Sequence, residues 1–452
     1  MSKLPENWVT AKLGALGVWS GGGTPSKSNP TFWEGGTIPW VSPKDMKFVS
    51  IDDSQDHITE SAVKGSATKI LPKGSLLVVT RSGILQHSLP VATNSRDVTL
   101  NQDLKALTPK DGFDVKYLYF ALRRFERDIL HACCKAGTTV QSIEFPRLKD
   151  FEIPIAPLSE QRRIVARIEE LFSRLDAGVA ALRHAKAQLQ RYRQSVLAAA
   201  VTGQLTQAWR EQHPVTEPAA KLLESILSER RLNWRGRGKY EVPVKPEGVF
   251  DELPASWEPI TFGHICQVQG GFAFKSNDFV SEGINLVKIA SLRAGKVDLD
   301  HNPTYLPSDY LAEYSRFALR KGDTLIAMSG ATTGKMGVYE SEDPALLNQR
   351  VGRFLPYTKT NVTAGFLSLL VEQIGDRVLK EAYGAAQPNI SPTEIEEMPF
   401  PLPPLVEQHQ IVAEVEARTT AIDHLAADLD RQITRSNRLR QSTLGSAFEG
   451  NL

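Results

Sequence analysis

The residues most suggestive of catalysis lie in one glycine-rich segment, Ser329-Gly330-Ala331-Thr332-Thr333-Gly334-Lys335. A phosphate-binding loop for ATP requires glycine, four residues, Gly-Lys and then a hydroxyl residue for magnesium. Here only three residues separate Gly330 from Gly334, and Met336 stands where the hydroxyl belongs. The segment therefore does not predict an ATP site.

Patterns for base or metal chemistry are also incomplete. Asn29-Pro30-Thr31-Phe32 and Asn302-Pro303-Thr304-Tyr305 are similar to the Asn-Pro-Pro-aromatic loop that holds a flipped base, but threonine replaces the second proline. There is no glycine-rich turn for a methyl donor. Asp45-x-Lys47 and Asp114-x-Lys116 lack the Pro-Asp partner of a metal nuclease, and the nine histidines form no metal pair at i, i+4. We therefore expect no catalytic residue, no metal site and no cofactor in this chain.

Polar, glycine-rich loops are placed alike in the two halves of the chain. Glycine lets backbone amides approach a phosphate, and Arg, Gln and Asn can bond guanine or adenine edges. An ordinary surface turn is the alternative for any single loop, but the parallel placement favours DNA binding. The candidate DNA-binding residues are Thr24, Ser26, Lys27, Arg81, Ser82, Gln141, Ser142, Lys275, Ser276, Arg293, Thr332, Thr333, Lys335, Gln387 and Asn389.

The chain contains a long internal repeat. Pro157-Leu158-Ser159-Glu160-Gln161 recurs as Pro404-Leu405-Val406-Glu407-Gln408, a shift of 247 residues (404 minus 157). The same shift pairs Leu100-Asn101-Gln102 with Leu347-Asn348-Gln349. Leu4-Pro5-x-x-Trp8 recurs from Leu253, with a shift of 249 residues (253 minus 4). The sequence therefore predicts two half-molecules, each a divergent globular domain followed by a close copy of one helical segment.

The repeated segment has the pattern of a long helix with an apolar heptad seam. Such a helix cannot bury its seam alone, so we expect the two copies to pair as an antiparallel coiled coil. The residues predicted for helix pairing or for docking a partner are Ile164, Ile168, Leu175, Leu182, Leu189, Ile411, Val415, Ile422, Leu429 and Leu439. The seams as counted also include Gly178, Tyr192 and Leu425. Between residues 161 and 193 the first copy carries eight basic and three acidic residues, either a solvated face or a surface for phosphates or an acidic partner.

Composition sets the wider limits. The chain has 452 residues, 53 Lys and Arg against 52 Asp and Glu, and three cysteines. The balanced charge predicts no bulk attraction to nucleic acid, so basic groups would have to be concentrated locally. A disulfide scaffold is excluded, and the absence of a signal peptide or an apolar run of 18 residues predicts a soluble, cytoplasmic protein.

The repeat and its motifs resemble the specificity (S) subunit of type I restriction–modification enzymes. The resemblance rests on Pro-Leu-x-Glu-Gln at each helix start, the segment 191–205, its copy ending at Leu452, Thr24-Pro25-Ser26, and Ala386-Gln387-Pro388-Asn389. It implies a mixed α/β chain with a pseudo-twofold repeat: target recognition domains at 1–152 and 253–399, helical spacers at 153–205 and 400–452, and a linker at 206–252.

The same resemblance implies the function and the partners. Each domain would read one half of a bipartite asymmetric site on double-stranded DNA, and the helices would set the spacer. The helices would also dock two methyltransferase (M) subunits, which bind S-adenosylmethionine, and through that core the restriction (R) subunits, which use ATP and magnesium. An orphan adapter, or a chain with its own methyltransferase activity, remains the alternative.

Overall fold

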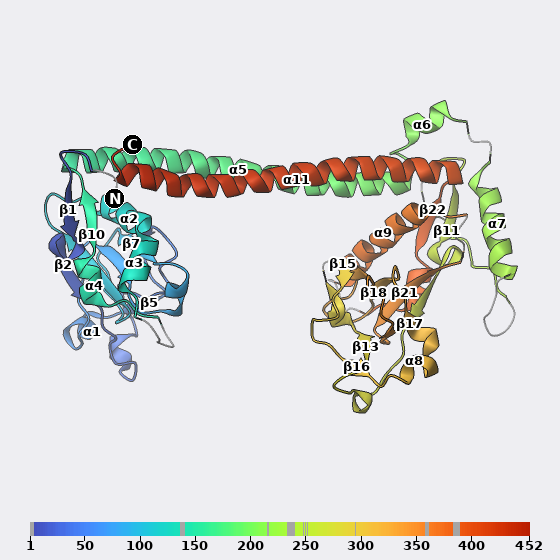
Figure 1. Ribbon diagram of the computed structural model, residues 1–452, viewed down its shortest axis with the longest axis horizontal. Helices are drawn as coiled ribbons and strands as arrows, with labels where there is room; N and C mark the ends of the chain where they lie inside the picture. The colour runs from blue at the N-terminus through green and yellow to red at the C-terminus, as the bar shows by residue number, and fades with distance from the viewer. Residues whose placement is uncertain are drawn as a thin grey trace. The chain divides into compact units, whose positions relative to one another are not determined.

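The computed structural model divides into two units. It describes residues 4–452 except 136–140, 215–216, 233–239, 247, 249, 251, 294, 358–360 and 383–388. Unit 1 comprises Met1–Lys186 with Ala427–Leu452, and unit 2 comprises Ala187–Ala426. Helices α5 (Leu158–Thr202) and α11 (Leu405–Phe448) each continue from one unit into the other. Each unit thus consists of one globular part and a part of each long helix (Figure 1).

The two long helices pair in opposite directions within each unit. In unit 1, Asp176 pairs with Arg440, and Lys186 Nζ lies 2.7 Å from Asp430 Oδ2. Ten residues forward along α5 therefore match ten residues back along α11. The pair Arg193–Asp423 continues the same register in unit 2. The predicted antiparallel helix pair, like the mixed α/β class, is confirmed.

The helix seam follows the predicted positions only in part. Ile164, Ile168, Ile411, Val415 and Ile422 are buried, whereas Leu175, Leu182, Leu189 and Leu429 are half-buried. Leu439, expected in the seam, is 45% exposed, and Arg440 is turned inward in its place. Gly178, Tyr192 and Leu425 are likewise exposed beside half-buried Val179, Arg193 and Ala426. An α-helix has 3.6 residues per turn, so a strict heptad count drifts by about 20° per heptad until the neighbouring residue faces the partner.

The described residues of the globular part of unit 1 form three sheets. The pair β1 (Val9–Lys12) and β10 (Glu152–Ile155) is antiparallel and precedes α5. The three-stranded sheet has the order β5 (Asp56–Ile58), β3 (Ile38–Val41) and β8 (Thr99–Leu100). The five-stranded sheet has the order β2 (Gly17–Gly21), β9 (Leu104–Pro109), β6 (Leu76–Val79), β7 (Val91–Asn94) and β4 (Ser50–Ile51). Its helices are α1 (Glu60–Lys64), α2 (Val115–Arg124), α3 (Glu126–Cys133) and α4 (Phe145–Asp150).

Unit 2 repeats this strand order, with one strand added at the edge of each of its two larger sheets. Its antiparallel pair is β11 (Glu258–Thr261) and β22 (Pro399–Leu402). A four-stranded sheet has the order β16 (Tyr305–Leu306), β13 (Ile284–Val287), β20 (Ala345–Leu347) and β17 (Ala318–Leu319). The six-stranded sheet has the order β12 (Cys266–Gly270), β21 (Val351–Pro356), β18 (Thr324–Ala327), β19 (Met336–Val338), β15 (Gly295–Val297) and β14 (Leu292–Arg293). Its helices are α6 (Gln207–Gln212), α7 (Ala219–Leu232), α8 (Tyr310–Glu313), α9 (Ala364–Ala382) and α10 (Pro392–Glu396).

Each core is completed by the end of the long helix from the other half of the sequence. In unit 1, Leu444, Ala447 and Phe448 of α11 are buried in the core cluster, and the Phe448 ring lies 5.0 Å from that of Tyr117. In unit 2, Val196 and Leu197 of α5 occupy the corresponding place. Full burial of a valine, leucine or phenylalanine side chain is worth about 1.5 to 3 kcal/mol, so each domain depends on both helices.

The carboxylate of Asp114 has a structural role. Its Oδ1 accepts hydrogen bonds from the backbone amides of Lys116 and Tyr117 at 2.9 and 3.1 Å, which caps α2. A residue of a suspected nuclease fragment is therefore an ordinary helix cap.

Among the described residues, no helix is long and apolar enough to cross a membrane.

Candidate nucleic-acid interface

The Glu-Gln pair that opens each long helix fixes it to the adjoining domain. Gln161 Oε1 accepts from the amide of Asp114 at 2.9 Å, and its Nε2 donates to the carbonyl of Ala156 at 2.8 Å. Gln408 makes the same two bonds with Thr363 and Pro403, at 3.0 and 3.1 Å. In both units the glutamine thus joins the start of the long helix to the start of a domain helix, α2 or α9.

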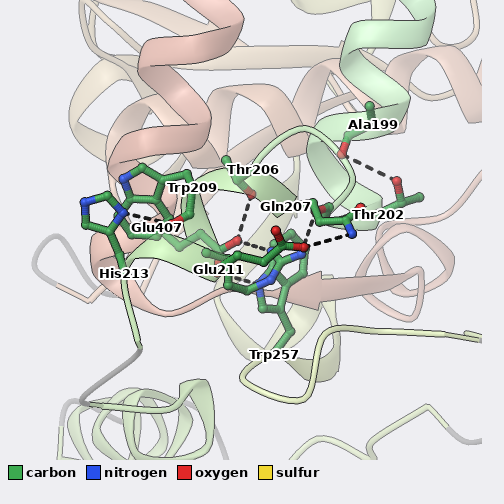
Figure 2. A network of polar contacts seen from close by, with 11 residues as sticks. Ala199, Thr202, Thr206, Gln207, Trp209, Glu211, His213, Trp257 and Glu407 are labelled. Carbon is green, nitrogen blue, oxygen red and sulfur yellow. Dashed lines mark hydrogen bonds and ion pairs between the residues drawn. The ribbon is translucent and has the colours of Figure 1, made fainter.

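The glutamate of each pair accepts a hydrogen bond from a tryptophan indole. Trp8 Nε1 donates to Glu160 at 3.2 Å, and Trp257 Nε1 donates to Glu407 at 2.8 Å. Glu407 is fully buried, and Thr206 Oγ1 also donates a hydrogen bond to it at 2.7 Å (Figure 2). Arg210 forms an ion pair with the same carboxylate. From the sequence, the glutamate was expected only to interact favourably with the helix dipole. The contact with tryptophan could have been inferred, because both residues recur in the two halves of the chain.

In unit 1 the candidate interface begins where β2 meets the turn before β9. A Cβ on Gly22 would lie 1.8 Å from the carbonyl oxygen of Asn101, so only glycine allows this approach. The amide of Gly23 donates to Leu100 at 2.9 Å, and the Thr24 hydroxyl donates to Gln102 Oε1. The loop after β2 and the turn at Asn101 therefore form one surface.

The segment after β6 joins the same surface. The amide of Arg81 donates to the carbonyl of Asp103 at 3.2 Å, and that of Ser82 to Gln141 at 3.1 Å. Arg81 and Ser142 form a β-bridge. The structure thus brings together five candidate residues from three distant segments: Thr24, Arg81, Ser82, Gln141 and Ser142.

Unit 2 repeats the arrangement. A Cβ on Gly271 would lie 2.2 Å from the carbonyl oxygen of Leu347, and the amide of Gln349 donates to Phe272 at 3.0 Å. The amide of Met328 donates to the carbonyl of Arg350 at 2.9 Å. Ser329 and Asn389 form the β-bridge that corresponds to Arg81–Ser142, displaced by one residue on the first strand.

A cavity of about 780 Å³ opens at this surface of unit 2. Its polar lining comes from Ser329, Gln349, Arg350, Asn389 and Ser391. Ser329 Oγ is buried and has no hydrogen-bond partner among the described residues. Ser391 caps α10, and its hydrogen bonds to Glu394 hold the pKa of that carboxyl below its usual range.

The remaining candidate residues take no part in the contacts described above. Ser26 Oγ bonds Ser28 at 2.8 Å, and Lys27, Lys275, Ser276 and Lys335 are exposed. Arg293 Nη1 lies 2.6 Å from His301 Nδ1 on the edge strand β14. Thr332 is half-buried, and Thr333, expected to face DNA, is buried because its hydroxyl donates to Gly330 at 2.7 Å to close the turn. Gln387 lies outside the described residues.

Four further polar residues lie on these surfaces and were not predicted from the sequence: Gln102, Asp103, Gln349 and Arg350. Their signal was present, because Leu-Asn-Gln recurs in two domains that otherwise diverge.

Much of the basic face of α5 is neutralised. Arg163, Arg167, Arg174, Lys186 and Arg193 each pair with a carboxylate. The described residues contain no group of three or more His, Cys, Asp or Glu side chains able to hold a metal ion.

The geometry defines a chain with two copies of one α/β domain and one helical segment, and comparison identifies its family. Residues 5–182 and 254–435 each match the model described as type I restriction modification DNA specificity domain. Because these segments cover well over half of the sequence, the chain belongs to that family, and the predicted membership is confirmed.

Individual relatives match over different lengths. The chain is 47% identical over 163 residues to the EcoR124I/EcoR124II specificity subunit of Escherichia coli, covering 36% of this chain and only 40% of that protein. It is 26% identical to the EcoBI specificity subunit of Escherichia coli, over 79% of this chain and 70% of the relative. It is 25% identical to the EcoKI specificity subunit of Escherichia coli (strain K12), over 100% of this chain and 90% of the relative.

Two solved structures share the fold. One chain, from a study of complex assembly and conformational transition of the type I R-M system, superposes with a TM-score of 0.65 at 19% identity and covers 100% of both chains. The HsdS subunit from Thermoanaerobacter tengcongensis has a TM-score of 0.55 at 17% identity, over 100% of this chain and 98% of that one.

Proposed function

We propose that this chain is the non-catalytic subunit that gives a type I restriction–modification complex its DNA sequence specificity. Each globular part reads one half of a bipartite, asymmetric site on double-stranded DNA. The catalytic groups and cofactors belong to the partners: S-adenosylmethionine to the M subunits, ATP and magnesium to the R subunits.

The observation that carries the proposal is the shared loop framework with different side chains. Both units bring a glycine loop, an Asn-Gln turn and a bridged strand end to one surface. At corresponding positions, 247 residues apart, unit 1 has exposed Arg81 and half-buried Asp103 where unit 2 has buried Met328 and exposed Arg350. A common frame with exchanged side chains is what reading two different half-sites requires, because base edges are distinguished by donor and acceptor pattern.

The long helices supply the docking surface for M. Between Ile168 and Val196 of α5 no residue is fully buried, and Leu175, Leu182 and Leu189 are half-buried. A two-helix pair leaves part of such an apolar stripe open, and helices of a partner can complete its packing. Since the repeat gives both halves similar helical surfaces, two M subunits can dock, and R subunits bind through them. The helical segments set the spacer of the site.

The test is to express the chain with its M partner and map methylated adenines across the genome. One bipartite motif with a fixed gap is the expected result. Exchanging residues 1–152 for a relative's domain should then alter one half-site and leave the other unchanged. Adding residues within the helices should lengthen the gap without changing either half-site.

Other outcomes discriminate the alternatives. A soluble complex with M that methylates no motif would indicate an orphan adapter. Crosslinking of a labelled methyl donor to this chain alone would indicate its own methyltransferase activity. Exchange of the domain without any change in the motif would refute the two-reader model.

A further inference from the structure

The Asn-Gln turn has a third residue that differs between the units, and that residue is placed to choose a base. In unit 1 the turn reads Asn101-Gln102-Asp103, and in unit 2 it reads Asn348-Gln349-Arg350. The first two residues are the same although the surrounding domains have diverged. The third changes from a carboxylate, which only accepts hydrogen bonds, to a guanidinium, which only donates them.

The asparagine is the fixed part of the turn. The amide of Asn101 donates to Val41 at 2.9 Å, and the amide of Asn348 donates to Val287 at 3.1 Å. Each asparagine side chain then accepts the amide of the third residue, at 3.0 Å for Asp103 and 3.4 Å for Arg350. The side-chain oxygen of each asparagine is therefore occupied in shaping the backbone of the turn.

The third residue is held from its other side as well. The carbonyl of Asp103 accepts the amide of Arg81 at 3.2 Å, and the carbonyl of Arg350 accepts the amide of Met328 at 2.9 Å. Arg81 and Met328 are 247 residues apart, as are Asp103 and Arg350. Both backbones thus place the third side chain at the same point of the loop surface.

Arg350 has no ion-pair partner in the part of the chain that the structure describes. Among the described residues, no carboxylate lies within 4 Å of its guanidinium. The rest of the polar cavity lining is neutral amides and hydroxyls, including the unpartnered Ser329 Oγ. A free guanidinium beside neutral groups suits the O6 and N7 acceptors of guanine.

Around Asp103 the chemistry is reversed. Its Oδ2 accepts from Asn101 Nδ2 at 3.2 Å and from Gln102 Nε2 at 3.5 Å. No ion pair joins it to a cation within the described residues of unit 1. On a surface that binds DNA, a carboxylate is repelled by the phosphates, so it is not suited to contact the DNA backbone. The other oxygen of Asp103, Oδ1, can accept a hydrogen bond from a base amino group. The N4 amino group of cytosine is the matching donor.

We propose that Asp103 and Arg350 each specify one G·C pair, Asp103 through the cytosine and Arg350 through the guanine. This inference rests on the proposed function, and it names the base pair that one position in each unit reads. Both half-sites then contain a G·C pair at corresponding positions, contacted through opposite members of the pair.

The test uses the full chain in complex with M and the same mapping of methylated adenines. In Arg350→Ala, one G·C position of the second half-site should become degenerate, with discrimination falling about 10- to 100-fold, while the first half-site is unchanged. Asp103→Asn should do the same to one G·C position of the first half-site only. Thermal unfolding of each variant checks that the domain remains folded.

Matched controls remove a charge elsewhere in the same unit. Lys321→Ala and Asp111→Ala change exposed residues outside the turn, and both motifs should remain intact. A uniform drop in methylation at all sites would mark Arg350 as a phosphate contact and overturn the proposal. Loss of preference at an A·T position, or at none, would also overturn it. Failure of the unmodified chain to yield any bipartite motif would instead refute the proposed function.

Discussion

The indole Nε1 of Trp257 donates a hydrogen bond to the buried carboxylate of Glu407 at 2.8 Å. The two residues come from segments that both recur in the sequence, one before each globular domain and one at the start of each long helix. The first copy makes the same contact between Trp8 and Glu160 at 3.2 Å. The repeat therefore preserves a joint between domain and helix.

The two copies of this joint should respond differently to the same substitution. Glu407→Gln leaves the carboxylate's donors, Thr206, Arg210 and Trp257, with one acceptor too few inside the protein. We expect unit 2 to lose about 3 kcal/mol of unfolding free energy. Glu160→Gln should cost about 1 kcal/mol or less, because Glu160 is partly exposed and its Arg163 pair is solvated.

Urea denaturation followed by tryptophan fluorescence measures both effects. The decisive comparison is the ratio of the two losses, since the chemical change is identical. Equal losses would show that the closure by Thr206 and Arg210 adds nothing to the joint.

The close approach of the glycine loop makes a second prediction. Gly271→Ala would place a Cβ 2.2 Å from the carbonyl oxygen of Leu347, so the loop or the turn must move. We expect unit 2 to lose about 2 to 4 kcal/mol and its half-site to lose specificity, whereas the first half-site is still read. Thermal unfolding and methylation mapping provide the two readouts.

A glycine without neighbours serves as the control. A Cβ on Gly178 of α5 would meet no atom within 4 Å. Gly178→Ala should therefore stabilise the protein by about 1 kcal/mol through helix propensity, with both half-sites unchanged. Destabilisation by this variant would contradict the solvent-exposed placement of Gly178.

The architecture was predictable because the sequence contains an internal repeat and a periodic spacing of apolar residues. The shift of 247 residues marked two domains and two helices, and apolar spacing marked their paired faces. The prediction that Leu439 lies in the seam was wrong, because a heptad count ignores the drift of a helix with 3.6 residues per turn. The candidate DNA-binding residues were predicted only as separate loops: Arg81 and Ser142 meet through β-pairing that no local pattern encodes. Thr333 is buried at a turn whose hydrogen bond depends on the folded hairpin.

Acid should weaken unit 2 through a buried histidine. Burial lowers the pKa of His264 to about 4, and the nearby charges of Arg230 and Lys245 act in the same direction. In the unfolded chain its pKa is near the ordinary value of 6.5. Between these values the unfolded state binds a proton that the folded state does not. Stability should therefore fall as pH decreases from about 6.5 to about 4, by up to about 1.4 kcal/mol per pH unit.

The contribution of His264 can be isolated by replacing it with a side chain that does not titrate. His264 Nδ1 accepts from the amide of Thr261 at 3.1 Å, and an asparagine oxygen can accept the same bond. In His264→Asn, the urea midpoint of unit 2 should change less with pH across this window than it does in the unmodified protein. An unchanged slope would assign the acid sensitivity to other groups.

Two leucines of α11 separate helix packing from partner docking. Leu444 is 3% exposed in the core of unit 1, whereas Leu439 is 45% exposed. Leu444→Ala should cost about 2 to 4 kcal/mol of unfolding free energy, and Leu439→Ala less than about 0.5 kcal/mol. If exposed leucines of the helices form the docking surface, Leu439→Ala should weaken binding of the M subunit about tenfold while unfolding stays unchanged. Titration of M against each variant, with stability measured in parallel, checks both; full M affinity in Leu439→Ala would place the docking surface on another face of the helices.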